Sequence, residues 1–404
     1  MIVLLTALAF TSTGREFMRF KVIALSAGGV GPVAVPLGVN EFITDESNLR
    51  LFDITQSDNK VPVPSQLEAG SPGRIWFMFD HAQGDRIFTV EQSDLEPTEG
   101  SSRLIRYPQS TVMAHGSREL VAYNHAEMMP PTGVNPAYRR SAFIHPLRSP
   151  SGEILTRIQP PDHYHHYGIW NPWTKTIING REIDFWNLVK EEGTVRFSGY
   201  LEQNQGVLYS GIKTHHTHIY FEQDSEHLAI NEVWDVRLWD LGLSDAYLLD
   251  LTVSLNTPLA NGIVMDAYRY GGGLGFRATE RWHRESSTVL TSEGKHRADA
   301  DGEGARWMIV EGVSDFGRSG ILFMSHPGNR MHPEPIRVWP EDANNGRGDL
   351  MIDISPIRNQ SWRLDPGRTY TLKYRMLVFD GNLPFSVAES YWNAFGFLPT
   401  IEIL

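Results

Sequence analysis

The feature that most constrains the fold is an apolar/polar alternation with a period of two residues, which recurs along most of the chain. "RIWFMFD" (74–80) and "RIFTVEQ" (86–92) flank "HAQGD", and together they predict a β-hairpin. "TIINGREIDFW" (176–186) contains Asn179-Gly180, a pair typical of the two-residue turns in hairpins. Short strands between turns rich in Gly, Asn and Asp predict an all-β, antiparallel protein.

The same alternation predicts two more hairpins and a late strand. "GIKTHHTHIYFEQ" (211–223) and "HLAINEVWDVRLW" (227–239) flank "DSE", whereas "RWMIVEGV" (306–313) and "SGILFMSH" (319–326) flank "SDFGR". "RTYTLKYRMLVFDG" (368–381) is typical of a further strand. Strands do not alternate with long helices, which argues against a doubly wound sheet.

One helix is predicted near the C-terminus, over "VAESYWNAF". Ser386 is expected to cap it, with Glu389 three residues later completing a capping box. Gly396 is expected to end it.

Composition narrows the classes of function. The net charge of −12 gives the chain no long-range attraction for phosphate backbones, so nucleic acid is not an expected partner. The chain has no cysteine, which excludes thiolate catalysis and leaves only His, Asp or Glu to hold a metal ion. Its eleven tryptophans suit β-sandwich cores or carbohydrate clefts.

Two segments suggest how the chain is divided. Residues 2–10 form an apolar run before small residues, which predicts a secretory leader over 1–17 and a secreted or periplasmic protein. Because no basic residue precedes Arg15, a buried first strand in a cytoplasmic protein is the alternative, and no other run approaches a membrane span. The polar stretch 94–103 predicts a boundary between a small N-terminal β-sandwich domain (18–100) and a large antiparallel β-domain (104–404).

The densest group of chemically useful side chains lies in "PPDHYHHYGIWNPW" (160–173). If the backbone is extended here, His163 and His165 share one face and His166 takes the other. Two imidazoles beside Asp162 suit either a divalent ion or acid–base chemistry. The spacing matches no named zinc signature. The other candidates in this segment are Tyr167, Trp170, Asn171 and Trp173.

A second group lies in the predicted hairpin. A strand places His216 and His218 on one face and His215 on the other, with Glu232 and Asp235 on the partner strand within cross-strand reach. Buried polar pairing or surface salt bridges would explain these residues equally well. Three histidine clusters in one domain nevertheless favour function, because burying unpaired imidazoles is costly.

Two glycine-containing segments complete the candidates. "AYRYGGGLGFR" (267–277) holds Tyr268 and Arg269 before three glycines, and it lacks the Lys-Ser/Thr of a phosphate loop. These glycines either let the backbone approach a ligand or turn a corner. "SHPGNR" (325–330) holds His326 and Asn329 in a polar turn.

Four segments carry a resemblance to a known family. "SAFIHPLRSPSGEILTRIQPPDHYHHYGIWNPWT" (141–174), "EIDFWNL" (182–188), "YRYGGGLGFRATERWH" (268–283) and "SHPGNRMHPEPIRVWP" (325–340) resemble a bacterial family of uncharacterised proteins commonly labelled methane oxygenase PmoA. The resemblance spans most of residues 20–380. Particulate methane oxygenase is a membrane copper enzyme, whereas this chain offers no spanning helix beyond the leader, so the label carries no expectation about activity.

The second domain of that family is similar to the galactose-mutarotase-like β-supersandwich, which serves epimerases, lyases and hydrolases of sugars. The resemblance therefore implies such a supersandwich over 104–404 and a sugar or sugar derivative as the bound molecule.

We therefore expect a carbohydrate-active protein that uses His and carboxylate acid–base chemistry for hydrolysis, epimerisation or elimination. The catalytic candidates are His163, His165, His166, Glu232 and Asp235. Trp170 and Trp173 are expected to form an apolar platform, and Arg148 and Arg269 to hold a carboxylate or polarise a carbonyl. The substrate-binding candidates are Arg148, Asp162, Tyr167, Trp170, Asn171, Trp173, His216, His218, Tyr268, Arg269, His326 and Asn329.

Two other classes of function stay open. One is a metal-dependent enzyme in which His163, His165 and Asp162 hold a divalent ion. The other is a non-catalytic glycan-binding protein. The sequence indicates no definite cofactor and no oligomeric state.

Overall fold

The computed structural model describes residues 16–37, 48–56, 59–70, 72–93 and 100–404. The chain forms two compact units, one of residues 1–99 with 398–404 and one of residues 100–397. Residues 398–404, which the sequence prediction placed in the large domain, pack with the small unit. Nearly all of the predicted leader lies outside the described residues, and its last two positions begin strand β1 (Glu16–Ile23).

The described residues of the small unit form two antiparallel sheets, with strand orders β28-β1-β7-β3-β4 and β2-β6-β5. The remaining elements are β2 (Val30–Pro36), β3 (Leu49–Asp53), β4 (Val61–Val63), β5 (Ser65–Glu68), β6 (Arg74–Asp80), η2 (His81–Gln83), β7 (Arg86–Gln92) and β28 (Thr400–Ile403).

The predicted hairpin of 74–80 with 86–92 is wrong. Both segments are strands, but β6 pairs with β2 and β5, whereas β7 pairs with β1 and β3 in the other sheet. The short helix η2 carries the chain between the sheets. Their apolar faces then pack across the sandwich, with the rings of Phe77 and Phe88 5.0 Å apart. Alternation identified each strand, but it could not identify the partner.

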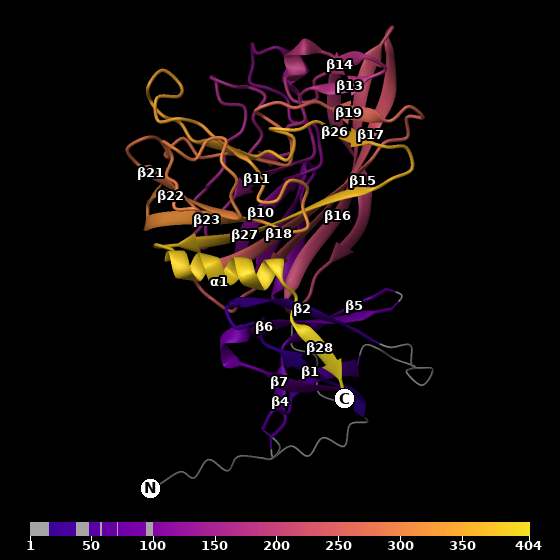
Figure 1. Ribbon diagram of the computed structural model, residues 1–404, viewed down its shortest axis with the longest axis vertical. Helices are drawn as coiled ribbons and strands as arrows, with labels where there is room; N and C mark the ends of the chain where they lie inside the picture. The colour runs from indigo at the N-terminus through magenta and orange to yellow at the C-terminus, as the bar shows by residue number, and fades with distance from the viewer. Residues whose placement is uncertain (1–15, 38–47, 57–58, 71, 94–99) are drawn as a thin grey trace. The chain divides into compact units, whose positions relative to one another are not determined.

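The large unit contains two eight-stranded antiparallel sheets and a four-stranded one (Figure 1). The first sheet has the order β24-β25-β20-β12-β11-β10-β9-β8, and the second β15-β16-β17-β18-β27-β23-β22-β21. The strands of the first are β8 (Ser102–Arg106), β9 (Ser110–His115), β10 (Arg118–Asn124), β11 (Phe143–Leu147), β12 (Ile169–Trp170), β20 (Leu274–Arg277), β24 (Ile336–Val338) and β25 (Met351–Ile354). Those of the second are β15 (Gly193–Asn204), β16 (Tyr209–Glu222), β17 (Ser225–Trp239), β18 (Ala246–Asn256), β21 (Ser287–Thr291), β22 (Trp307–Ser314), β23 (Gly317–Ser325) and β27 (Tyr370–Asp380). The four-stranded sheet contains β13 (Thr176–Ile178), β14 (Arg181–Ile183), β19 (Ile263–Met265) and β26 (Trp362–Leu364).

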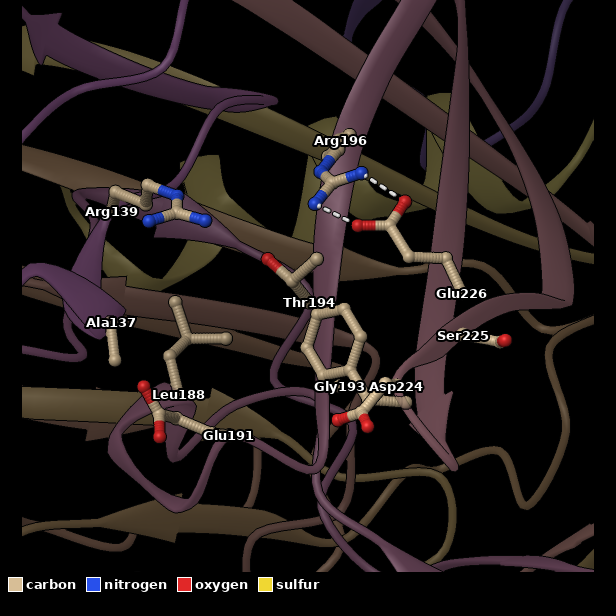
Figure 2. Close-up of a pocket in the computed structure, with 11 residues that line it drawn as sticks. Ala137, Arg139, Leu188, Glu191, Gly193, Thr194, Arg196, Asp224, Ser225 and Glu226 are labelled. Carbon is tan, nitrogen blue, oxygen red and sulfur yellow. Dashed lines mark hydrogen bonds and ion pairs between the residues drawn. The ribbon is translucent and has the colours of Figure 1, made fainter.

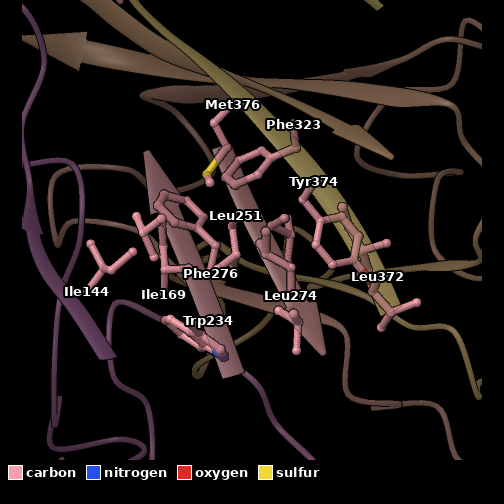
Figure 3. Close-up of a cluster of buried hydrophobic side chains, with 14 of the residues drawn as sticks. Ile144, Ile169, Trp234, Leu251, Leu274, Phe276, Phe323, Leu372, Tyr374 and Met376 are labelled. Atoms are coloured by element: carbon pink, nitrogen blue, oxygen red, sulfur yellow. The ribbon is translucent and has the colours of Figure 1, made fainter. Parts of the chain in front are cut away.

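The main core of this unit lies where the two large sheets face each other (Figure 3). Alternate residues of each strand point inward, as the period-two pattern requires. Phe276 of β20 meets Phe323 of β23, with ring centroids 5.2 Å apart. Each such fully buried apolar side chain contributes about 1.5–3 kcal/mol to stability. The predicted all-β, antiparallel class is confirmed.

Three of the predicted hairpins are confirmed. β13 pairs with β14 through Asn179 and Gly180, which both have positive φ, as a two-residue hairpin turn requires. β16 pairs with β17, and β22 pairs with β23. The predicted late strand is β27, which lies between β18 and β23.

The predicted helix is α1 (Phe385–Gly396), the single α-helix of the described residues, and it packs against β22 and β23 (Figure 1). The expected capping box is absent, because Pro384 occupies the N-cap position. Glu389 instead accepts hydrogen bonds from the side chains of Arg306 and Trp307. No helix among the described residues has the length and apolar character needed to cross a membrane.

Candidate functional site

The histidine-rich loop 160–166 forms consecutive turns rather than an extended strand. The amide of His163 donates to the carbonyl of Pro160 at 2.9 Å, and the amide of His166 donates to that of His163 at 3.1 Å. The expectation of alternating faces is therefore wrong. The turns bring three imidazoles together, with ring centroids 4.8 Å (163–166), 4.9 Å (165–166) and 5.3 Å (163–165) apart.

These imidazoles line a cavity of about 200 Å³. The ring of His163 lies 4.7 Å from that of Trp339, and the ring of His165 lies 5.2 Å from that of Trp186. The cavity is therefore an aromatic pocket with imidazoles in its wall. The residues that line it are His163, His165, His166, Trp186, Asn187, Tyr268, Arg269, Tyr270 and Trp339.

Two of these imidazoles lack hydrogen-bond partners within the described part of the chain. Both ring nitrogens of His166 are buried and unpartnered, and its side chain is 0% exposed. No side-chain hydrogen bond from His165 is found among the described residues either. Burial lowers the pKa of His166 well below its usual range and that of His165 to about 4, so both are neutral at pH 7. Buried polar groups are normally paired, so these nitrogens point to a polar ligand.

His163 differs, because a carboxylate orients it. Its Nδ1 lies 2.9 Å from Oδ2 of Asp162, which also accepts from Nη2 of Arg277 at 2.8 Å. Burial alone would raise the pKa of Asp162, but the bond to His163 and the charge of Arg277 lower it to about 2. Asp162 is thus an anion at neutral pH. When Nδ1–H donates to that anion, Nε2 carries the lone pair in the uncharged form of the ring.

Hydrogen bonds from their own indoles hold the aromatic walls in place. Nε1 of Trp186 donates to the carbonyl of His165 at 2.9 Å. Nε1 of Trp339 donates to the hydroxyl of Tyr270 at 3.1 Å, and Arg277 lies over the Trp339 ring at 4.8 Å. A wall fixed in this way is preorganised, which lowers the entropic cost of binding.

The predicted tryptophan platform does not form, because Trp170 and Trp173 are both 0% exposed. Trp170 packs beneath the ring of His166 at 5.3 Å, and Trp173 belongs to the main core. Tyr167 and Asn171 are also buried, and each donates to a backbone carbonyl, that of Tyr138 and of Gly273 respectively. Tyr167 and Trp170 share a buried cluster with Trp186 and Trp339, so these two residues pack behind the walls of the pocket.

The three glycines of 271–273 make a tight corner. Gly272 has a φ of +67°, and a Cβ there would lie 1.9 Å from the ring of Trp173. The amide of Gly271 donates to Oδ2 of buried Asp353 at 3.1 Å. Of the two interpretations of this run, close packing has the support of the structure. The corner also fixes the preceding residues Tyr268 and Arg269, which do line the cavity.

The second histidine cluster lies inside the sandwich. His216 and His218 share the inner face of β16, as predicted, and His216 faces Glu232 of β17. Nδ1 of His216 and Nε2 of His218 lie 3.0 and 3.3 Å from Oε2 of Glu232. Nε2 of His216 lies 2.8 Å from the hydroxyl of Tyr123. All three members of the cluster are at most 1% exposed, and none of them lines the histidine cavity of about 200 Å³.

The structure places the remaining candidates apart from the pocket. Asp235 accepts from Arg237, and Arg148 donates to the carbonyl of Gly152. His326 packs against Phe395 of α1. Asn329 bonds to Glu334 and to the backbone of Lys373.

A larger cavity of about 390 Å³ lies between the 3₁₀ helices η3 (Pro136–Tyr138) and η4 (Leu188–Lys190), the start of β15 and the tip of the β16–β17 hairpin (Figure 2). It contains no histidine. Arg196 makes two hydrogen bonds to Glu226 in its wall, so that pair is already satisfied (Figure 2). We therefore regard the histidine pocket as the better candidate site.

The fit of a metal ion can be tested on the side chains themselves. Among residues 16–37, 48–56, 59–70, 72–93 and 100–404, no three His, Asp or Glu side chains are placed to hold one. Nδ1 of His163, a proposed ligand, already bonds to Asp162. The predicted set of His163, His165 and Asp162 is therefore not arranged as a metal centre.

Sequence reasoning missed five residues of the site, although each lies in a segment that carries the family resemblance. Trp186 and Asn187 lie in "EIDFWNL", and Trp339 lies in "IRVWP". Tyr270 and Arg277 flank the glycine run. Three separate motifs contain aromatic or basic residues, and this shared composition could have indicated that they line one pocket.

Comparisons with known proteins extend this description. A galactose mutarotase-related enzyme from Lactobacillus acidophilus has a TM-score of 0.29 and 10% identity, over 69% of this chain and 97% of that one. An α-galactosidase from Lactobacillus brevis has a TM-score of 0.23 and 11% identity, over 71% of this chain and 40% of that one. No curated protein matches the chain in sequence. A family model described as "Family of unknown function (DUF6807)" matches residues 110–393, which include the whole histidine pocket. The chain therefore belongs to the DUF6807 family.

Proposed function

We propose that the histidine pocket binds a single sugar ring or a sugar derivative and catalyses an acid–base reaction on it. Hydrolysis, epimerisation and elimination are the reactions considered, and each requires proton transfer at a positioned side chain. His163 is the proposed base and then, as an imidazolium, the proposed acid, and His165 or His166 is the proposed hydrogen-bond donor to the reacting oxygen.

The observation that supports this most is the set of unpartnered imidazole nitrogens inside an aromatic pocket. A sugar hydroxyl both donates and accepts hydrogen bonds, so it suits neutral histidines. The faces of Trp186 and Trp339 suit the apolar face of a sugar ring. A volume of about 200 Å³ is below the ~300–1,000 Å³ of pockets for drug-sized ligands, which favours one ring over a longer chain.

The proposed proton path uses the dyad of Asp162 and His163. Asp162 accepts from Nδ1–H and stabilises the imidazolium that forms when Nε2 takes a proton from the substrate. The imidazolium of His163 then returns this proton to the departing or newly charged oxygen, and neutral His165 or His166 stabilises that oxygen by donating a hydrogen bond from its N–H. Proton transfer of this kind accelerates reactions by about 10²–10⁴-fold.

The test is turnover of a panel of monosaccharides and glycosides, followed by ¹H NMR in D₂O. Loss of a C–H signal would report proton abstraction, and a new anomeric signal would report hydrolysis. We expect His163→Ala to lower kcat by about 10²–10⁴-fold while Kd changes by only a few-fold. His296→Ala is the matched control, because His296 is exposed and does not line the pocket.

Each other outcome is informative. Unchanged turnover in His163→Ala would overturn the assignment of the base. Binding without turnover in the wild-type protein would favour a glycan-binding protein. Activity that disappears with a chelator and returns with a divalent ion would favour the metal-dependent alternative.

A further inference from the structure

Arg269 is the only permanently charged residue among the nine that line the histidine pocket. Its guanidinium lies over the ring of Tyr270, 5.2 Å from the centroid, and the side chain is exposed. Arg358 donates to the backbone carbonyl of Arg269 at 3.2 Å, which ties the loop to its surroundings. Arg269 therefore presents a positive charge at the edge of the pocket.

That charge has no carboxylate partner within the described residues. Its neighbours differ: Arg337 and Arg358 both pair with Asp301, at 2.8 and 3.2 Å. Other arginines, such as Arg140 and Arg297, also lack a carboxylate partner in the described part of the chain, but they donate to backbone carbonyls. No hydrogen bond from the Arg269 side chain is found among the described residues. A guanidinium over an aromatic ring leaves its N–H edge free to bind a carboxylate.

The pocket also lacks a group that would repel an anion. None of its nine lining residues is Asp or Glu. Asp162 lies next to the pocket, but it pairs with Arg277 at 2.8 Å. Asp349, which Arg277 also contacts at 2.9 Å, pairs with Arg347 at 3.2 Å as well. Burial keeps the pKa of His165 and of His166 low, so both neutral rings are able to receive hydroxyl groups of the same ligand.

We propose that the ligand is a sugar acid, a monosaccharide that carries a carboxylate, with Arg269 as the residue that selects it. The carboxylate binds Arg269, the ring lies between the aromatic walls, and hydroxyl groups bond to His165 and His166. This inference rests on the proposed function, because it names the ligand class of the same pocket.

The experiment compares two matched pairs, glucuronate with glucose and galacturonate with galactose, by titration calorimetry. The members of each pair differ only at C6. We expect the wild-type protein to bind one acid at least 10-fold more tightly than its neutral partner, because a charge-assisted hydrogen bond corresponds to about 10- to 100-fold in affinity. Added salt should weaken binding of the acid and leave the neutral sugar unaffected.

Arg269→Gln should remove this preference by weakening the acid about 10- to 100-fold while changing the neutral sugar by less than 3-fold. Arg269→Lys should keep part of the preference for the acid that Arg269→Gln loses, because lysine retains the positive charge. Arg363→Gln is the control, because Arg363 is exposed and bonded to Asp365 outside the pocket. Equal loss for acid and neutral sugar in Arg269→Gln would overturn the inference, as would a wild-type preference for the neutral sugar.

The two proposals fail separately. If neutral sugars are turned over and His163→Ala abolishes that turnover, the proposed function stands and the sugar-acid inference fails. If Arg269 selects acids but His163→Ala leaves their turnover unchanged, the ligand class stands and the catalytic assignment fails. If neither member of either pair binds, the inference is overturned.

Discussion

The large unit contains two clusters of histidines, and they differ in what surrounds their ring nitrogens. His216 and His218 lie between sheets and bond to Glu232, with Tyr123 as a further partner of His216. His165 and His166 lie in a turn-rich loop, line a cavity and lack such partners among the described residues. Both ring nitrogens of His216 are bonded in the first arrangement, although Nδ1 of His218 and Oε1 of Glu232 have no partner among the described residues. In the second arrangement, neither ring nitrogen of His166 is bonded to a described residue.

The difference teaches that residue type and burial do not identify a functional histidine. Both clusters are rich in imidazole and include a fully buried ring. A buried network with its bonds made contributes to a unique core. A buried polar ring without bonds is costly, so it persists where something other than stability requires it.

The largest effect in this comparison is expected for Glu232→Gln. This change removes the negative charge of the carboxylate to which His216 and His218 both bond. We expect a loss of about 1–3 kcal/mol in the free energy of unfolding, because the buried hydrogen bonds to the two imidazoles lose their charged acceptor. Chemical denaturation measures it. If the variant is as stable as the wild type but loses turnover, the inner cluster is functional and the comparison fails.

The pH dependence of stability tests the burial of His165 next. Burial lowers the pKa of His165 from 6.5 to about 4, so the unfolded chain takes up this proton first as the pH falls. Stability is therefore full above about pH 6.5 and is lost as the pH falls toward 4, at about 1.4 kcal/mol per pH unit for one proton.

His165→Gln should reduce that slope by close to one proton, measured from unfolding free energies between about pH 4.5 and 6.5. Asp162 does not interfere, because its pKa is lowered from 3.8 to about 2 and its contribution is lost only below about pH 4. His296→Gln is the control. An unchanged slope in His165→Gln would show that His165 is not held neutral in the pocket.

A smaller effect is expected in the larger cavity. Arg196 is 29% exposed and paired with Glu226, which is 51% exposed. Arg196→Gln should cost only about 0.2–1 kcal/mol, because solvent screens exposed ion pairs. Thermal unfolding together with sugar binding at the histidine pocket checks this. Loss of binding in this variant would move the candidate site to the larger cavity.

The smallest loss of stability is expected where a buried imidazole has no partner. His166→Phe should leave the free energy of unfolding unchanged or raise it by up to about 1–3 kcal/mol, because a buried unpaired polar group is replaced by an apolar ring. It should abolish ligand binding. His216→Phe is the matched variant. Its free energy of unfolding should fall below that of the wild type, because Glu232 and Tyr123 each lose a hydrogen-bond partner. Equal effects in the two variants would contradict the distinction between the clusters.

Many of the strands were predictable, because the apolar/polar alternation that identifies a strand involves residues close together in the sequence. The alternation over 211–223 and 227–239 predicted both strands, their turn, and the shared face of His216 and His218. The contact of His216 with Glu232 across the two strands followed from their antiparallel pairing alone. The pairing of 74–80 with 86–92 failed for the same reason, because alternation states which face is apolar and not which strand lies beside it.

Several residues of the candidate site were predictable from the sequence, but their arrangement in space was not. The sequence pointed to His163, His165 and His166, and to Tyr268 and Arg269, which one cavity does bring together. It also pointed to Trp170 and Trp173, whose indoles are buried, and missed Trp186 and Trp339, whose indoles form the walls. Sequence proximity to a histidine does not decide which way an indole faces.

The sequence by itself determined an antiparallel β protein, the faces of its long strands and the segment that carries the candidate site. Only the tertiary structure decided that loop 160–166 turns, that residues from four separate segments form one pocket, and that, within the described part of the chain, both ring nitrogens of His216 are bonded while neither of His166 is. The physical reason is that strand periodicity arises between neighbouring residues. Hydrogen-bond partners and cavities arise between residues far apart in the chain, and their presence or absence depends on packing.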